Sequence, residues 1–164
     1  MKKIVAILFA CFAFVGVYAQ NQAVTLWEEL KKQGTVSMDF NLKGTDTEGM
    51  VVTNEEGKAY LQGDCYRIEC GDMLICCDGT SMWLYNNTSE ELVIDQDEAL
   101  PFMKATDVKK DQQGNVNATY VADDITFKVK VSNIQHPGSR YDASFFTIDQ
   151  STLPEDVIVT DLRD

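Results

Sequence analysis

Four cysteines lie close together in the middle of the chain, and thiols can bind a metal or form a disulfide. Cys65, Cys70, Cys76 and Cys77 fall on two short segments separated by Gly71-Asp72. Zinc ligands usually come as Cys-x2–4-Cys pairs in loops, whereas these cysteines lie inside predicted strands, so we expect no metal site. If Gly71-Asp72 is a two-residue turn, Ile68 faces Ile75 and Arg67 faces Cys76. Cys65 is then diagonal to Cys76, and Cys70 lies near Cys77. One disulfide and four reduced thiols both remain open, and four cysteines allow three pairings.

Residues suited to acid–base or nucleophilic catalysis are scarce or scattered. His136 is the single histidine and precedes Pro137 in a predicted loop, which argues against a Ser-His-Asp triad. Glycosidases need two converging carboxylates. The polar positions of the predicted strands and turns carry candidates for such a pair, which are Asp39, Glu69, Asp78, Asp95, Asp123 and Asp124. Their spread favours a solvated acidic surface, so we expect no catalytic residue, no cofactor and no enzyme activity.

Charge and apolar content indicate which classes of protein remain possible. Hydrophobic residues make up 45% and charged residues 24% of the 164 residues, which is typical of a globular domain. Acidic residues number 26 against 14 basic ones, for a net charge of -12, so the chain lacks the basic excess of a nucleic-acid binder. Aromatic residues occur in nearly every predicted element, where they form either a plain core or the lining of an apolar pocket.

Two hydrophobic periods define the elements that must position these residues. Apolar residues three and four apart predict a helix over 22–33, with Val24, Trp27 and Leu30 on its buried face. After Gly34 the period changes to two, which predicts strands. The predicted strands cover 36–42, 50–53, 59–62, 65–70, 73–77, 81–85, 92–95, 116–121, 125–131, 144–149 and 157–160. A short helical or irregular segment is expected over 97–106.

The separators between these strands favour hairpins. Gly63-Asp64, Gly71-Asp72 and Asp78-Gly79 have the composition of tight turns, and residues 54–57 are interpreted as a turn as well. One helix, a long antiparallel meander, a crossing segment and further hairpins make an α+β fold. Because a sheet of many strands tends to coil, we expect a strongly curved antiparallel sheet. The helix and the crossing segment would cover its concave side.

The first residues predict an export signal. Lys2 and Lys3 precede an apolar run, and Val17-Tyr18-Ala19 places small residues at the -3 and -1 positions of a cleavage site. We therefore expect a signal peptide over 1–19 and one exported domain over 20–164. Without the two lysines the formal charge becomes 12 minus 26, or -14. These expectations place the domain in the periplasm.

Three stretches carry a further pattern. The first lies between Gly57 and Asn86 and ends in Asp-Gly-Thr-Ser-Met-Trp-Leu-Tyr-Asn, the second is Leu-Pro-Phe-Met at 100–103, and the third runs from Phe145 to Arg163 through Leu153-Pro154. In this order they resemble the "DGktlWiYnp", "tPfml" and "lP.gv.v.DlR" motifs of the LolA-like family of periplasmic lipoprotein carriers. The similarity covers most of the chain after residue 19.

The resemblance implies a LolA/LppX-like fold, an incomplete barrel of antiparallel strands closed by helices. It further implies a lipid-binding carrier, or chaperone, that takes up the acyl chains of lipoproteins for transport to the outer membrane. An inner-membrane donor and an outer-membrane acceptor would be its protein partners. From the apolar phase of each element, the expected lipid-binding residues are Trp27, Leu30, Met38, Phe40, Ile68, Ile75, Phe102, Met103 and Phe127.

A second function fits the same fold. If the apolar interior is filled by side chains, the protein is a non-enzymatic interaction module that binds a protein partner through its surface. An open apolar pocket would favour the lipid carrier, because an acyl chain needs volume as well as apolar walls.

Overall fold

The computed structural model describes residues 20–96, 105 and 107–163. The predicted signal peptide and most of the predicted crossing segment, with Phe102 and Met103, lie outside the described residues. The elements in chain order are α2 (Gln20–Lys32), β1 (Thr35–Thr45), β2 (Val51–Gln62), β3 (Cys65–Cys70), β4 (Met73–Cys77), β5 (Ser81–Asn86), β6 (Glu91–Gln96), β7 (Asp107–Lys110), β8 (Val116–Ala122), β9 (Ile125–Gln135), the 3-10 turns η3 (Ala143–Phe146) and η4 (Gln150–Thr152), and β10 (Ile158–Asp161).

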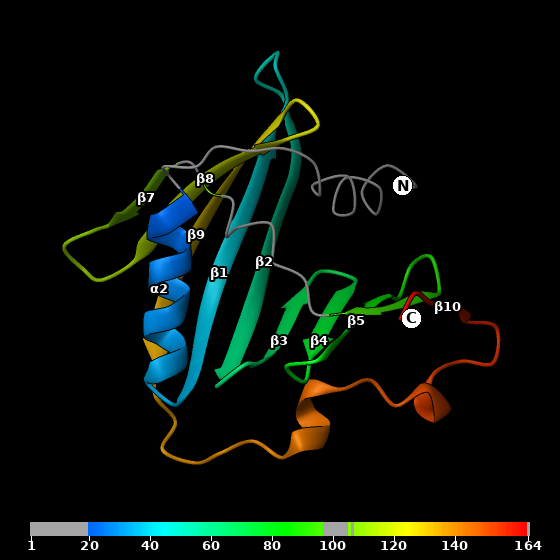
Figure 1. The fold of residues 1–164 in the computed structure, drawn as a ribbon. Coiled ribbons are helices and arrows are strands. Elements are labelled where there is room, and N and C mark those ends of the chain that lie inside the picture. Colours follow the sequence, from blue (N-terminus) through cyan, green and yellow to red (C-terminus); the bar gives the residue numbers. More distant parts are fainter. Residues whose placement is uncertain (1–19, 97–104, 106, 164) are drawn as a thin grey trace.

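The strands form a single mixed sheet in the order β10-β6-β5-β4-β3-β2-β1-β9-β8-β7 (Figure 1). Neighbouring strands are antiparallel except for β10, which runs parallel to β6. The sheet is neither closed nor strongly curled, and β10 and β7 are its two edges. The described chain is therefore mostly β with a helix at its amino end. The expectation of a strongly curved, incomplete barrel is wrong.

Apolar side chains on both faces of β5 account for the open shape. All six residues of this strand are buried. Met82 and Leu84 point to the face beneath α2, whereas Trp83 and Tyr85 point to the opposite face. A sheet with a single apolar face can hide it by rolling up, but a sheet with two needs a covering layer on each side.

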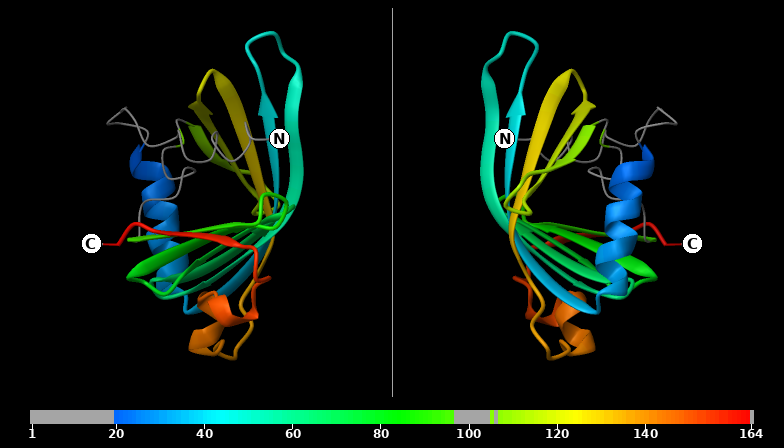
Figure 2. Two further views of the ribbon diagram at one scale, coloured as in Figure 1. Left: turned by 90° about the vertical axis from the view of Figure 1, so that its right-hand side faces the viewer. Right: turned by 90° about the vertical axis from the view of Figure 1, so that its left-hand side faces the viewer.

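The segment after β9 supplies the second layer. Figure 2 shows α2 on one side of the sheet and the orange segment with η3 and η4 on the other. Ile148, Leu153 and Val157 of this segment pack with Trp83 and its neighbours on β4 and β6. The second apolar face is thereby covered by chain that follows the sheet's hairpins.

The strand predicted over 144–149 is wrong, because this stretch contains η3. The Asp142 carboxylate accepts a hydrogen bond from the Ser144 amide at 2.9 Å and caps the turn. Arg67 on β3 then donates to the Phe145 carbonyl at 3.2 Å, and its guanidinium lies 4.8 Å from the Phe145 ring centroid. These contacts fix the segment to the sheet in a non-extended form.

The hairpin turns predicted at Gly63-Asp64 and Gly71-Asp72 are confirmed. Gly63 and Gly71 have φ values of 61° and 55°, which glycine adopts at little cost at the first position of a two-residue turn. The turn predicted over 54–57 is wrong, since β2 continues through it in register with β1. The predicted strands at 50–53 and 59–62 are therefore one long strand.

Candidate functional site

One face of the sheet is apolar across most of its width. Alternate residues of a strand point to the same face, so a chain of cross-strand pairs defines a row of side chains on one side. The pairing gives two adjacent apolar rows across β1 to β5, which are Val36-Leu61-Tyr66-Cys77-Met82 and Met38-Ala59-Ile68-Ile75-Leu84. We call the surface formed by these rows the helix-side face.

Helix α2 lies on this face through residues one turn apart. Trp27 meets Tyr66 edge-on, with ring centroids 5.8 Å apart, and Leu30 is buried one turn later. Ala23 is only 1% exposed, whereas Val24 is 40% exposed. The expectation that Val24 faces the core is therefore wrong, because the buried stripe follows positions i, i+4 and i+7 from Ala23.

The helix-side face and α2 together form a continuous apolar cluster. Its buried members are Trp27, Leu30, Val36, Met38, Ala59, Leu61, Tyr66, Met73, Ile75, Cys77, Met82 and Leu84. Half-buried apolar residues pack around them, which are Leu26, Phe40, Ile68, Val131 and Ile134. We call this set the helix-side cluster.

The structure brings together most of the residues predicted to bind lipid. Six of them, from Trp27 to Ile75, belong to the helix-side cluster or pack against it. Phe127 lies in a separate cluster with Ala23, Tyr120 and Ile125, at the other end of α2. The helix contributes to both clusters, through Ala23 to one and through Trp27 to the other.

Eight buried members of the cluster are not among the residues predicted from sequence to bind lipid. These eight are Leu61, Met73, Met82, Val36, Ala59, Tyr66, Cys77 and Leu84. Strand phase could have found the first two, since Leu61 is two positions from Ala59 and Met73 two from Ile75. Met38, Met73 and Met82 give the cluster three thioether side chains. Methionine adapts to irregular apolar surfaces because it is unbranched and polarizable.

A glycine on β2 makes room for an aromatic ring on this face. Gly57 pairs with Phe40, and a Cβ atom built at Gly57 would collide with the Phe40 ring and with the Glu69 carbonyl. Local composition predicts a turn at Gly57, but the role of this glycine is close packing within a strand. Phe40 thereby lies over β2 at the border of the cluster.

Cys65, Cys70, Cys76 and Cys77 are thiols and not disulfides in this structure. The predicted pairing of Arg67 with Cys76 is confirmed, but Cys77 pairs with Tyr66, four positions from Cys70. Four strand residues span about 13 Å, so the expectation that Cys70 lies near Cys77 is wrong, and a disulfide could not join them. Burial raises the pKa of the Cys70 and Cys76 thiols to about 11.

Most of the carboxylates considered for catalysis lie in turns or in an ion pair. Asp78 caps its own turn by accepting hydrogen bonds from the Thr80 and Ser81 amides at 2.9 Å. Glu69 accepts from Arg67 at 2.8 Å. Asp95 accepts from the following amide, while Asp123 and Asp124 form the β8–β9 turn with φ values of 48° and 64°.

The face opposite α2 is polar at β1, β2 and β9. A shallow depression of about 510 Å³ lies there, lined by Asp39, Phe40, Asn41, Glu56, Gly57, Lys58, Lys130 and Ser132. Asp39 accepts a hydrogen bond from the Asn133 amide group at 2.9 Å. The mixture of two carboxylates, two ammonium groups, an amide and a hydroxyl on an open surface is typical of a solvated sheet face.

Comparisons with known proteins show the fold alone. No family model and no curated protein matches the chain. Among solved structures, an uncharacterized conserved protein from Thermus thermophilus is similar, with a TM-score of 0.51 and 10% identity over 85% of this chain and 98% of that one. The two share a large, mostly antiparallel sheet. No helix in the described part of the chain is long and apolar enough to cross a membrane.

Proposed function

We propose that this protein is a periplasmic carrier of lipids or acyl chains, with lipoproteins destined for the outer membrane as its cargo. The observation that carries the proposal is the helix-side cluster, an apolar surface on an open sheet with α2 laid across it. The motif resemblance to LolA-like carriers and the predicted signal peptide support the same function. An inner-membrane donor and an outer-membrane acceptor are proposed as partners on the resemblance alone.

The energetics of acyl-chain binding suit this surface. Each methylene removed from water contributes about 0.8 kcal/mol. A chain of about fourteen carbons therefore gains roughly 10 kcal/mol in gross transfer energy, before the costs of ordering are subtracted. The half-buried Phe40 and Ile68 border the cluster and would be the first side chains to contact an entering chain. Met38, Met73 and Met82 can repack around cargo of different lengths.

A fluorescent fatty acid and a diacylated peptide test the proposal directly. We expect both probes to bind at micromolar concentration. Ile68→Glu places a carboxylate among apolar residues, and desolvating it costs several kcal/mol, so the affinity should fall at least tenfold. The matched control is Asn41→Glu, which adds the same charge on the opposite face of the sheet. Circular dichroism of both variants establishes that the sheet is retained.

A filled-core module that binds a protein partner is the second candidate. The observation in its favour is the direct contact between Trp27 of the helix and Tyr66 of the sheet, together with the burial of the twelve cluster residues. If neither probe binds to the parent protein, the carrier function is wrong and the filled-core module is preferred. If Ile68→Glu and Asn41→Glu weaken binding equally, the lipid lies elsewhere on the molecule.

A further inference from the structure

Strand β10 leaves one edge of the sheet open to pairing. The amides of Ile158 and Leu162 donate to the carbonyls of Glu90 and Ile94 on the β6 side, at 2.9 and 2.8 Å. Backbone groups of successive strand residues alternate in direction, so the N–H and C=O of Val159 point away from β6. The N–H and C=O of Asp161 also point away from β6. In the part of the chain that the structure describes, no strand pairs with this outer side.

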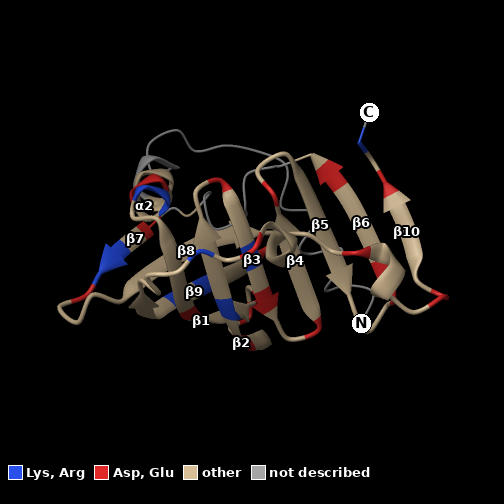
Figure 3. Ribbon diagram, turned by 90° about the horizontal axis from the view of Figure 1, so that it is seen from below, with Lys and Arg blue, Asp and Glu red and all other residues tan. Residues whose placement is uncertain are grey.

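The two edges of the sheet differ in how they are protected. Figure 3 shows them at opposite ends, with the arrow of β7 in the blue of lysine and β10 mostly uncharged. Lysines on an edge strand oppose the docking of a further strand, and β7 carries Lys109 and Lys110. On β10 and just after it, Ile158 and Leu162 are 61% and 50% exposed. The β10 edge is apolar where the β7 edge is charged.

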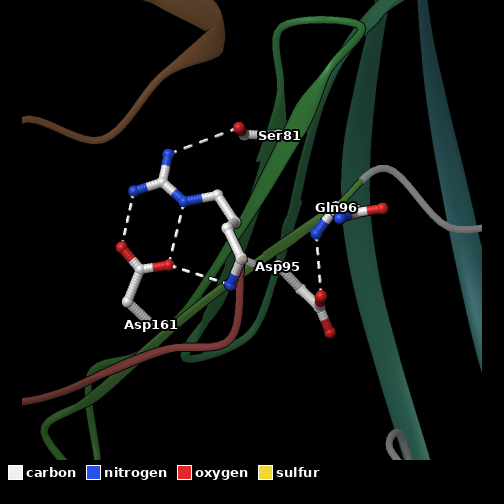
Figure 4. Close-up of polar contacts among 5 residues, drawn as sticks. Ser81, Asp95, Gln96 and Asp161 are labelled. Atoms are coloured by element: carbon white, nitrogen blue, oxygen red, sulfur yellow. Dashed lines mark hydrogen bonds and ion pairs between the residues drawn. The ribbon is translucent and has the colours of Figure 1, made fainter.

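Charge also favours association at β10. The Asp161 carboxylate accepts from the Arg163 guanidinium at 2.9 and 2.6 Å, and the same guanidinium donates to Ser81 on β5 at 3.3 Å (Figure 4). Residues 157–163 contain one carboxylate and one guanidinium, which neutralise each other. In a chain with a net charge of -12, this neutral edge can approach a second copy with little local repulsion.

We propose that β10 pairs antiparallel with β10 of a second copy of this chain, about a twofold axis at Thr160. This register uses the outward backbone groups of both Val159 and Asp161, because Val159 of each copy exchanges hydrogen bonds with Asp161 of the other. This register places Ile158 opposite Leu162 of the second copy, and the reverse, on the helix-side face. Both contacts of the symmetric pair are apolar, and Thr160 faces its own counterpart across the axis.

The short strand makes the dimer weak. The weakest interfaces that bury about 1,600 Å² have micromolar affinity. A pair of four-residue strands buries a smaller area. We therefore expect a dissociation constant of tens of micromolar or more. Pairing would continue the sheet from one copy into the next and bring their helix-side faces onto the same side.

Sedimentation velocity over a range of protein concentrations tests the dimer. The expected result is a monomer at low concentration and a growing dimer fraction above about 50 µM. Ile158→Lys should weaken the dimer at least tenfold, because an ammonium group then enters each of the two small Ile158–Leu162 contacts. Val121→Lys is the matched control, since Val121 is 62% exposed on β8 and far from this edge in the strand order. A parent protein that stays monomeric up to about 1 mM overturns the proposal, as does a dimer equally weakened by both variants.

A cross-link tests the register. A non-hydrogen-bonded antiparallel pair has Cα atoms about 4.5 Å apart, which a disulfide can bridge. Thr160→Cys should therefore form a covalent dimer under mild oxidation, whereas Val121→Cys and the parent chain should not. Rapid cross-linking through Thr160→Cys, reversed by a reductant, supports the twofold axis at this residue. Equal cross-linking of the two variants overturns it.

Discussion

Replacing Phe146 by alanine tests whether this buried ring stabilises the segment after β9 more than its half-buried neighbour does. Phe146 is 1% exposed, whereas its neighbour Phe145 is half-buried. A buried phenylalanine removes about 150 Å² or more from water, and at about 25 cal/mol per Å² this is roughly 4 kcal/mol. With the methyl group retained and a cavity left behind, Phe146→Ala should lower the free energy of unfolding by about 3–5 kcal/mol.

Phe145→Ala is the comparison, because it deletes the same ring one position earlier. Because the Phe145 ring is only half-buried, its removal loses about half of the transfer energy of a buried ring. The variant also loses the ring contacts with Tyr141 and Tyr60, whose centroids lie 4.6 and 5.2 Å from that of Phe145. The Phe145 carbonyl still accepts from Arg67 in this variant, since the acceptor belongs to the backbone. We expect a cost of about 1.5–2.5 kcal/mol, so the two variants should differ by about 2 kcal/mol.

Urea unfolding followed by circular dichroism measures both costs. For a domain of this size, a loss of about 4 kcal/mol corresponds to a fall in Tm of roughly 8–16 °C. The m-value should stay unchanged if both variants retain the native sheet. Equal costs for Phe145→Ala and Phe146→Ala would refute the reasoning, because burial would then not decide the contribution of the ring.

Three further predictions follow from burial and charge. Trp83→Ala should lower the free energy of unfolding, measured in urea, by about 3–5 kcal/mol. An unchanged stability would place the Trp83 ring outside the apolar cluster on the face opposite α2. Hydrogen bonds from Arg163 lower the pKa of Asp161 to about 2, so its stabilising effect should persist above about pH 4 and be lost as the pH falls through about 2. Carboxyl NMR should show this pKa rising toward 3.8 in Arg163→Ala; no rise would contradict the pairing. A thiol reagent at about pH 8 should modify half-buried Cys65 well before Cys76, whose pKa burial raises to about 11; equal rates would contradict the burial of Cys76.

The hairpins of the meander could be predicted from local sequence. The bounds of β3 and β4 agree with the predicted 65–70 and 73–77 because Gly63 and Gly71 mark the turns and the strands between them are short. The Ile68–Ile75 pair and the Arg67–Cys76 pair follow from the turn length alone. Local signals suffice here because each strand pairs with its neighbour in sequence.

The turn predicted wrongly over 54–57 shows where local sequence signals fail. Asn54 and Gly57 favour turns by composition, yet both lie in β2 and pair with β1. The deciding contact is the Phe40 ring over Gly57, which joins positions on two different strands. A glycine required for close packing has the same local sequence signal as a glycine required for a turn.

The second apolar layer could not be foreseen for a similar reason. Phe145 and Phe146 in an alternating run favour a strand, but Asp142 caps a 3-10 turn and Arg67 holds it from β3. Both faces of β5 are buried as a consequence, and the sheet remains open. Of the candidate site, strand phase predicted Met38, Phe40, Ile68 and Ile75 on β1, β3 and β4, but the prediction omitted Val36, Tyr66, Met73 and Cys77 of the same strands. The exact helix stripe depended on how α2 meets the sheet.

The parallel pairing of β10 with β6 has a consequence for the order of folding. Ile158 pairs with Glu91, far earlier in the chain, whereas Cys70 pairs with Met73 across a two-residue turn. Closing a long loop costs chain entropy before the contact repays it. The hairpins from β1 to β6 can therefore form first, and we expect β10 to join the sheet after them. In native hydrogen exchange, the amides of β10 should open before those of the central hairpins and without global unfolding.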